Sequence, residues 1–546
     1  MKHSNFRKVM YFAIAVSMVA CQTIDDPILD PNQIGTVIES DNEFITTEGQ
    51  TVLGDAIDIP YSIENLLKAY ENLPAQTKSE IDPKDIQPTH YYVRFYPKSI
   101  EEQDILRNIK PYVFLSETPL DRKVVVGGSS YHDPSIPEDL PTFQYTVVPV
   151  ERWRELEKTV PVEAEILIKA YIPDYDEAYT TKSEEQYGIP AHAYDALLKE
   201  AYRITGNEYF PETKASWTPS GRIRAYDNVH NAMTPVPGVR VRATHLLKVK
   251  EGLTDNEGRF TLASFNSSVT YKIIWESNDW DIMDGLTGQA TFDGPTLSTS
   301  WFPEIGTTHE KNVRYAATQR AAYTFYFKDI EGILRPAFNN KLKICQHDTS
   351  NSYPSVFTNA NAMGYHIESW IYDIFGSLHS IDKMYYVIAH ELGHSAHYSH
   401  NDNDYGSYST AVKESWALFS GLIAYNKEYG SQNTDGFIYY NVYEKEWPGT
   451  SSGNSIEYTP IFLDLYDDYN QHLDNTIPNC SSLPDDSVSG YTGLQLSGIL
   501  SNNTYTLSNL KTKVKWSEPV GVTDSDIDTL FELYVTNSVD DFINPN

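Results

Sequence analysis

Short alternating runs of apolar and polar residues between residues 218 and 300 constrain the fold of this chain more than any other feature. Turn residues separate four of these runs: Arg222–Tyr226, Val239–Ala243, Phe260–Ala263 and Val269–Trp275. A period of two is typical of strands that bury one face, and short strands at this spacing favour a β-sandwich of about seven strands. Helical spacing returns from about residue 310, so the pattern predicts more than one domain.

The chain has 546 residues, a length that suits about three domains. Residues 51–215 mix helices with three strand-like runs: His90–Tyr96, Tyr112–Leu115 and Phe143–Val148. A capping box of Ser99 and Glu102 predicts the start of one of those helices. We therefore predict a multidomain α+β fold, with an N-terminal α+β domain at 51–215, a β-sandwich at 216–305 and a mainly helical domain at 306–546.

The central segment also carries a family resemblance. The strings GRIRAYD, PVPGVRVRA and GLTDNEGRFTL, between Gly221 and Leu262, resemble the carboxypeptidase-regulatory-like (transthyretin-like) domain. This resemblance implies a transthyretin-like β-sandwich that acts as a spacer or a binding module. It says almost nothing about chemistry.

Residues 385–400, YYVIAHELGHSAHYSH, contain His390-Glu391-Leu392-Gly393-His394. Two histidines four apart on a helix lie on the same face, so both rings can bind one ion. Glu391 then lies beside the ion without having to bind it, as a zinc hydrolase requires of its base. Such a pentapeptide also occurs by chance in roughly a few per cent of long chains, so the flanking residues have to support it.

A catalytic zinc takes three protein ligands and keeps one open position. His400 is one candidate for the third ligand, because HELGHSAHYSH resembles the metzincin pattern HExxHxxGxxH. That pattern needs glycine where this chain has His397, and it needs a later methionine, whereas the last methionine here is Met384.

Glu414 is the other candidate, and we favour it. It lies in the next helical segment, at about the separation found in gluzincins, where a glutamate from the following helix completes the site. Ala417 and Gly421 are small and would let the two helices approach closely. Thermolysin-like gluzincins have an aspartate where this chain has Leu418, so the residue that orients His390 must come from elsewhere.

Together these motifs resemble a gluzincin-like, zincin-type zinc metallopeptidase. The resemblance implies that His390, His394 and Glu414 bind Zn²⁺ and that Glu391 is the catalytic base. The expected substrate is an extracellular protein or glycoprotein, lying alongside an edge strand at His366–Tyr372. The other expected elements of this domain are an amphipathic helix at Asn312–Ile330, a strand at Lys341–Cys345 and a helix at Val412–Tyr425. Three residues are open candidates for stabilising the oxyanion: Tyr439, Tyr440 and Tyr458.

A function of another class stays open: a non-catalytic surface lipoprotein that binds glycan or peptide, with a structural or vestigial zinc site. Glu391 argues against it, because a structural zinc needs no base, whereas a fourth ligand such as His397 would favour it. His397 is otherwise expected to line the cleft or to make a local hydrogen bond. Asp402, Asn403 and Asp404 lack the spacing of an EF-hand loop, so no calcium site is predicted.

The N-terminus predicts export. Lys2, Arg7 and Lys8 precede the mostly apolar stretch Val9–Ala20, which is too short to span a bilayer, so residues 1–20 are expected to be a cleaved signal peptide. Met18-Val19-Ala20-Cys21 resembles a bacterial lipobox, and Asp25-Asp26 resembles the export tether of Bacteroidetes surface lipoproteins. These resemblances imply a lipid anchor at Cys21, a flexible tether at 21–50 and a place on the outer membrane, at the cell surface.

The formal net charge is −33. Such a surface repels nucleic acid and anionic lipids, so we expect no nucleic-acid partner and no membrane contact except through Cys21. The expected partner is a protein or peptide substrate, and the oligomeric state is open. Cys345 and Cys480 are the other cysteines, and outside the cytoplasm they could form a disulfide or stay as two thiols.

Overall fold

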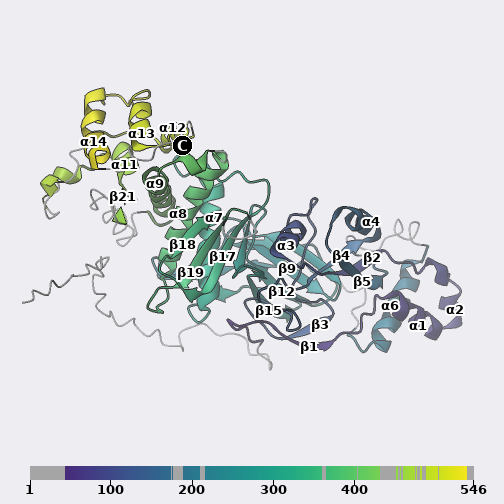
Figure 1. The fold of residues 1–546 in the computed structure, drawn as a ribbon. Helices are drawn as coiled ribbons and strands as arrows, with labels where there is room; N and C mark the ends of the chain where they lie inside the picture. The colour runs from purple at the N-terminus through teal and green to yellow at the C-terminus, as the bar shows by residue number, and fades with distance from the viewer. Residues whose placement is uncertain are drawn as a thin grey trace, which may run out of the picture. The chain divides into compact units, whose positions relative to one another are not determined.

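The computed structural model describes residues 44–173, 175, 188–208, 216–359, 364–401, 404–430 and, in shorter pieces, 451–452, 455–456, 459–473, 475, 480–482, 487–501 and 503–537 (Figure 1). These residues form a mixed α and β structure with several sheets. The predicted signal peptide, most of the predicted tether and Cys21 lie outside them. No helix within the described ranges is long and apolar enough to cross a membrane.

The N-terminal part, residues 44–208, is built around an antiparallel sheet in the order β4-β2-β5. Its strands are β2 (His90–Phe95), β4 (Gln144–Pro149) and β5 (Ala164–Ala170), with a separate pair formed by β1 (Val52–Ala56) and β3 (Arg122–Val126). Its helices are α1 (Ile63–Asn72), α2 (Ala75–Lys78), α3 (Ile100–Arg107), α4 (Val150–Thr159) and α6 (Ala191–Ile204). Tyr92 and Val93, consecutive in β2, are buried in different apolar clusters because successive side chains of a strand face opposite sides.

Two local predictions for this part have different outcomes. Half of the predicted capping box forms at α3. The Ser99 hydroxyl accepts a hydrogen bond from the Glu102 backbone N–H, but the Glu102 carboxylate accepts from the backbone N–H of Lys98 in place of that of Ser99. The strand predicted at Tyr112–Leu115 is wrong, because that segment forms no strand. Its aromatic rings instead lie under guanidinium groups of the next segment, with Arg240 4.5 Å from the centre of the Tyr112 ring. The aromatic residues of this run therefore pack on arginine side chains of β9 and do not pair in a sheet.

The strand-like runs predicted between residues 218 and 300 are confirmed as strands. They form a four-stranded sheet, β10-β9-β12-β15, a three-stranded sheet, β16-β7-β8, and a pair, β11-β6. The strands are β6 (Ser220–Arg222), β7 (Arg224–Asp227), β8 (Ala232–Pro235), β9 (Arg240–His245), β10 (Lys248–Leu253), β11 (Arg259–Thr261), β12 (Val269–Ile274), β15 (Thr291–Leu297) and β16 (Glu304–Ile305). Val241 and Ala243 of β9 are fully buried, and Arg242 between them is only 3% exposed, so both faces of this strand are covered.

A five-stranded sheet crosses the boundary that the sequence suggests near residue 305. Its order is β14-β13-β17-β19-β18, with β13, β17 and β19 parallel and β14 and β18 antiparallel at the two edges. The strands are β13 (Trp280–Asp284), β14 (Gly288–Gln289), β17 (Leu342–Ser350), β18 (Ser355–Thr358) and β19 (His366–Tyr372). One apolar core also runs from Ile223 to Phe531, so the strand-rich segment and the following helices fold against each other.

The prediction that His366–Tyr372 is an edge strand is wrong. These residues form β19, but β18 pairs antiparallel with β19 and takes the edge position. The four residues of β18 read polar, apolar, apolar, polar, so no alternation marked them as a strand.

After residue 305, helices α7 (Glu310–Phe327), α8 (Ile381–His400) and α9 (Thr410–Tyr429) pack against one another. The amphipathic pattern predicted for the first of these is wrong, because α7 is buried on nearly every side between β7, β13, α8 and α9. The remaining helices are α11 (Ile461–Tyr466), α12 (Gly493–Leu500), α13 (Leu507–Val514) and α14 (Asp524–Asn537). Cys345 and Cys480 are both unpaired.

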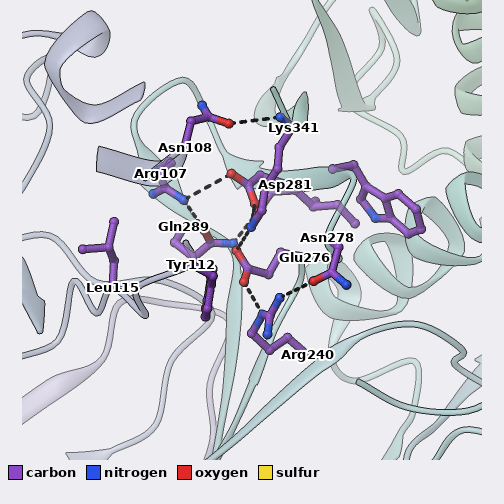
Figure 2. A network of polar contacts seen from close by, with 12 residues as sticks. Arg107, Asn108, Tyr112, Leu115, Arg240, Glu276, Asn278, Asp281, Gln289 and Lys341 are labelled. Atoms are coloured by element: carbon purple, nitrogen blue, oxygen red, sulfur yellow. Dashed lines mark hydrogen bonds and ion pairs between the residues drawn. The ribbon is translucent and has the colours of Figure 1, made fainter. Parts of the chain in front are cut away.

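Buried ion pairs join the N-terminal part to the five-stranded sheet (Figure 2). Arg107, at the end of α3, pairs with Asp281 of β13 at 3.9 Å. Lys341, just before β17, binds Asp281 at 3.0 Å and Glu276 at 2.9 Å, and Arg240 also pairs with Glu276. Because each buried charge faces an opposite one, removing a single partner would leave a costly unpaired ion.

Candidate metal centre

The HELGH motif lies in the middle of α8, where α9 packs closely against it. Gly421 of α9 faces His390, and a Cβ at residue 421 would come within 3.0 Å of the backbone nitrogen and Cα of His390. A Cβ at residue 393 would likewise clash with Ser420 and would lie 3.0 Å from the Ala417 Cα. The prediction that Ala417 and Gly421 let the helices approach closely is therefore confirmed.

His390, His394 and Glu414 come together across these two helices. The Glu414 Oε2 atom lies 3.3 Å from His390 Nε2 and 3.2 Å from His394 Nε2. One potential ligand atom from each residue lies within 4.8 Å of the other two, and no other group of three or more His, Cys, Asp or Glu residues in the described ranges is arranged in this way. His394 is buried, and His390 and Glu414 are partly buried.

The charges of the three side chains reinforce one another. Burial raises the pKa of Glu414, but the facing imidazoles of His394 and His390 outweigh burial and hold that pKa well below its ordinary value. Burial lowers the pKa of His394, and the Glu414 carboxylate reverses this, so the net shift is upward. Zinc binds only the neutral imidazole, so a bound ion would replace the proton that Glu414 favours on His394. With His394 neutral, the centre offers one carboxylate oxygen and two imidazole nitrogens, which is a donor set that a catalytic zinc takes. The residues present fit such an ion.

Glu391 lies next to this group but is not part of it. It is 5% exposed, and its Oε1 atom accepts a hydrogen bond of 2.8 Å from the hydroxyl of Ser355 at the start of β18. Ser355 therefore fixes one oxygen of the carboxylate from the edge of the five-stranded sheet.

Tyr405 contacts the far side of the His394 ring. Its hydroxyl shares a hydrogen bond of 3.2 Å with His394 Nδ1. Burial and the nearby carboxylates of Glu414 and Glu391 raise the pKa of Tyr405 well above its ordinary value, so its hydroxyl stays protonated. Second partners of this kind fix the orientation of a metal-binding histidine. Sequence reasoning missed both Ser355 and Tyr405, since no spacing rule links them to the motif.

The other sequence candidates lie elsewhere. His400 is the last residue of α8 and its Nε2 atom lies 3.1 Å from the Arg335 carbonyl oxygen. The helix continues through His397, so it lacks the left-handed turn that would bring His400 back to the centre. His397 is buried against Tyr405 and Tyr408, and neither of its ring nitrogens has a hydrogen-bond partner among the described residues. The local hydrogen bond considered for it is therefore not found.

Several candidates cannot be placed. Tyr439, Tyr440 and Tyr458 lie outside the described residues, as do Asp402 and Asn403. Leu418, where an orienting aspartate would stand in thermolysin-like members, is 1% exposed.

A scan against protein-family models gives no match to this chain, and a search of curated proteins gives none either. The function is therefore inferred from the geometry of the centre.

Proposed function

We propose that this chain is a zinc metallopeptidase of the zincin type, with a gluzincin-like set of ligands. It would hydrolyse peptide bonds of an extracellular protein or glycoprotein. The observation that carries the proposal is the convergence of His390, His394 and Glu414 within 4.8 Å, with Glu391 beside them. The proposal includes the domain assignment: an N-terminal α+β domain and a transthyretin-like β-sandwich, followed by a mainly helical zincin-like domain.

His390, His394 and Glu414 would hold the ion. A bound zinc would make a water molecule more acidic and polarise the scissile carbonyl. Glu391 takes a proton from the attacking water and delivers it to the leaving amine. Because the Ser355 hydroxyl occupies Glu391 Oε1, the other carboxylate oxygen is the one that accepts this proton.

The edge strand β18 supports a peptide as the substrate. An extended peptide can add to an exposed sheet edge through backbone hydrogen bonds. Ser355 belongs to β18 and contacts Glu391, so a peptide paired with the outer edge of β18 would pass beside the proposed base. This strand takes the part that the sequence assigned to His366–Tyr372.

The non-catalytic alternative receives less support. A structural zinc is normally closed by four protein ligands, whereas the group formed by the described residues has three members and excludes His397. A purely structural ion would also give the buried Glu391 carboxylate no role, because a structural zinc site needs no base.

We also propose that the protein is exported and held at the outer-membrane surface by a lipid on Cys21. The lipobox-like Met18-Val19-Ala20-Cys21 supports this. A Cys21→Ser variant should lose incorporation of a labelled fatty acid; unchanged labelling would contradict the anchor.

The experiment that tests the activity compares wild type with Glu391→Gln on a library of labelled proteins and peptides. E391Q should lose turnover by at least a hundredfold, since general-base catalysis contributes about 10²–10⁴, and it should keep its zinc. Glu138→Gln, at an exposed site in the N-terminal part, is the matched control and should keep full activity. Full turnover in E391Q would contradict the proposed mechanism.

A further inference from the structure

A cavity of about 350 Å³ lies between the N-terminal part and the sheet β10-β9-β12-β15. One wall contains residues between Ser116 and Val124. The other includes alternate residues of β9 and β12 and Thr296 of β15, together with His245 and Leu246. Small-molecule pockets in proteins typically enclose about 300–1,000 Å³. None of the lining residues belongs to the metal centre, so the cavity is a separate candidate binding site.

The sheet wall carries a row of hydroxyl groups. Thr244, Thr270 and Thr296 are paired across β9, β12 and β15, and the hydroxyls of Thr270 and Thr296 share a hydrogen bond of 2.7 Å. Tyr271, next in β12, is fully buried on the opposite face, as strand alternation requires. Hydroxyls both donate and accept hydrogen bonds, so this row suits a ligand that itself carries hydroxyls.

The cavity is basic although the chain is acidic. No acidic residue stands among the lining residues that the structure describes. Four basic residues line the cavity: Arg122, Lys123, Arg242 and Lys272. A chain with a net charge of −33 would place acidic groups there if the lining were a random sample of its surface. The arrangement therefore indicates a local preference for negative charge.

The two pairs of basic residues differ in their partners. Arg242 and Lys272 are neutralised from outside the cavity by carboxylates at 2.6 and 2.7 Å, those of Glu251 and Asp293. Arg122 and Lys123 are exposed, and no carboxylate of the described residues lies within ion-pair distance of either. Arg122 Nη1 donates to the Gly54 carbonyl oxygen at 3.2 Å. Two positive charges thus remain available at the side of the cavity formed by β3.

We propose that this cavity binds an acidic saccharide, a sugar ring that carries one carboxylate. The carboxylate pairs with Arg122 and Lys123, and the ring hydroxyls bind the threonine row. The apolar face of the ring packs on Leu120 and Leu246, which also line the cavity. A polyanion is disfavoured because the chain as a whole carries a net charge of −33 and would repel it.

Isothermal titration of the full chain with D-glucuronate and D-glucose tests this assignment. Glucuronate should bind at least tenfold more tightly than glucose, and added sodium chloride should weaken its binding because salt screens exposed charges. The double variant R122Q/K123Q should bind glucuronate at least tenfold more weakly than wild type, with an unchanged unfolding midpoint. K84Q/K199Q removes two exposed positive charges elsewhere and should bind as wild type does.

Three outcomes would overturn the proposal. Wild type could fail to bind glucuronate, which would leave a hydrated crevice between two packed parts. R122Q/K123Q could bind as tightly as wild type. Inorganic sulfate could bind as tightly as glucuronate and displace it, which would make the cavity a simple anion site. None of these results depends on zinc, so failure here would leave the proposed peptidase function untouched.

Discussion

Asn228 and Asp382 exchange two hydrogen bonds. The Asn228 side-chain amide donates to Asp382 Oδ1 at 2.8 Å, and the Asp382 backbone N–H donates to Asn228 Oδ1 at 3.0 Å. Asn228 directly follows β7, whereas Asp382 is in the first turn of α8. The strand-rich segment therefore fixes the start of the helix that carries the candidate ligands. Its contacts go beyond those of a simple spacer between the N-terminal and C-terminal parts.

Replacing Asn228 by Ala should destabilise the protein. It removes both hydrogen bonds and leaves a helix N–H and a carboxylate oxygen without this partner, which costs about 1–3 kcal/mol. Denaturant unfolding at neutral pH measures the loss. Asn340→Ala, at an exposed position, is the control and should change the free energy of unfolding little; equal losses in both variants would contradict the account.

Replacing Gly421 by Ala should disturb the metal centre. Alanine improves helix propensity by about 1 kcal/mol, but the new Cβ would press on the His390 backbone at 3.0 Å, and such overpacking costs about 1–3 kcal/mol. We expect a small net loss of stability together with weaker zinc binding. Gly498→Ala in α12 is the matched control, because nothing lies within 4 Å of its added Cβ, and it should stabilise the protein. A gain of stability in both variants, with zinc affinity intact, would show that the helix contact is unimportant.

Replacing Tyr405 by Phe should weaken zinc binding without unfolding the protein. The change removes the hydrogen bond to His394 Nδ1 and keeps the aromatic packing. Loss of such a partner typically costs about 10–100-fold in metal affinity, and competition with a chelator measures it. Tyr408→Phe is the control, since that ring also contacts His397 but its hydroxyl bonds to Asn401 and the Leu500 carbonyl oxygen. Equal zinc affinity in wild type and Y405F would show that the Tyr405 hydroxyl does not support zinc binding by His394.

Glu428 should make the fold sensitive to acid. Burial raises its pKa, but Arg320 and Lys328 outweigh burial and lower it to about 2, from 4.5 for the unperturbed group. Because the folded-state pKa is the lower one, the ionised carboxylate contributes stability above about pH 4.5 and loses it as pH falls towards 2. The contribution is about 3 kcal/mol. Denaturant unfolding between pH 7 and pH 3 should show a smaller loss on acidification in Glu428→Gln than in wild type; parallel curves would contradict this.

The convergence of the two histidines was predictable from local structure, because residues four apart on a helix lie on the same face. Glu414 was predicted only through the resemblance to gluzincins, since its contact with the histidines depends on how α9 packs on α8. Ser355 and Tyr405 were not predictable. Their contacts depend on how β18 and the segment after α8 pack on the motif, and no local pattern encodes that packing.

The fold shows the same division. The strands between residues 218 and 300 were predicted because alternation is a local signal. That β13 pairs with β17, a strand beyond residue 305, was not predicted, because alternation does not reveal which strand a strand will join. The prediction that α7 is amphipathic failed for a related reason. Arg320 of α7 is buried in ion pairs with Asp227 and Glu428, so a charged residue in the sequence does not mark an exposed helix face.

Metal content tests the central claim most directly. Residues 22–546 would be purified as wild type, Glu414→Ala and His400→Ala, supplied with zinc, and analysed for bound metal. Wild type and H400A should each hold about one zinc per chain, as three protein ligands require, and E414A should lose it. Zinc kept in E414A and lost in H400A, or absent from wild type, would contradict the proposed centre.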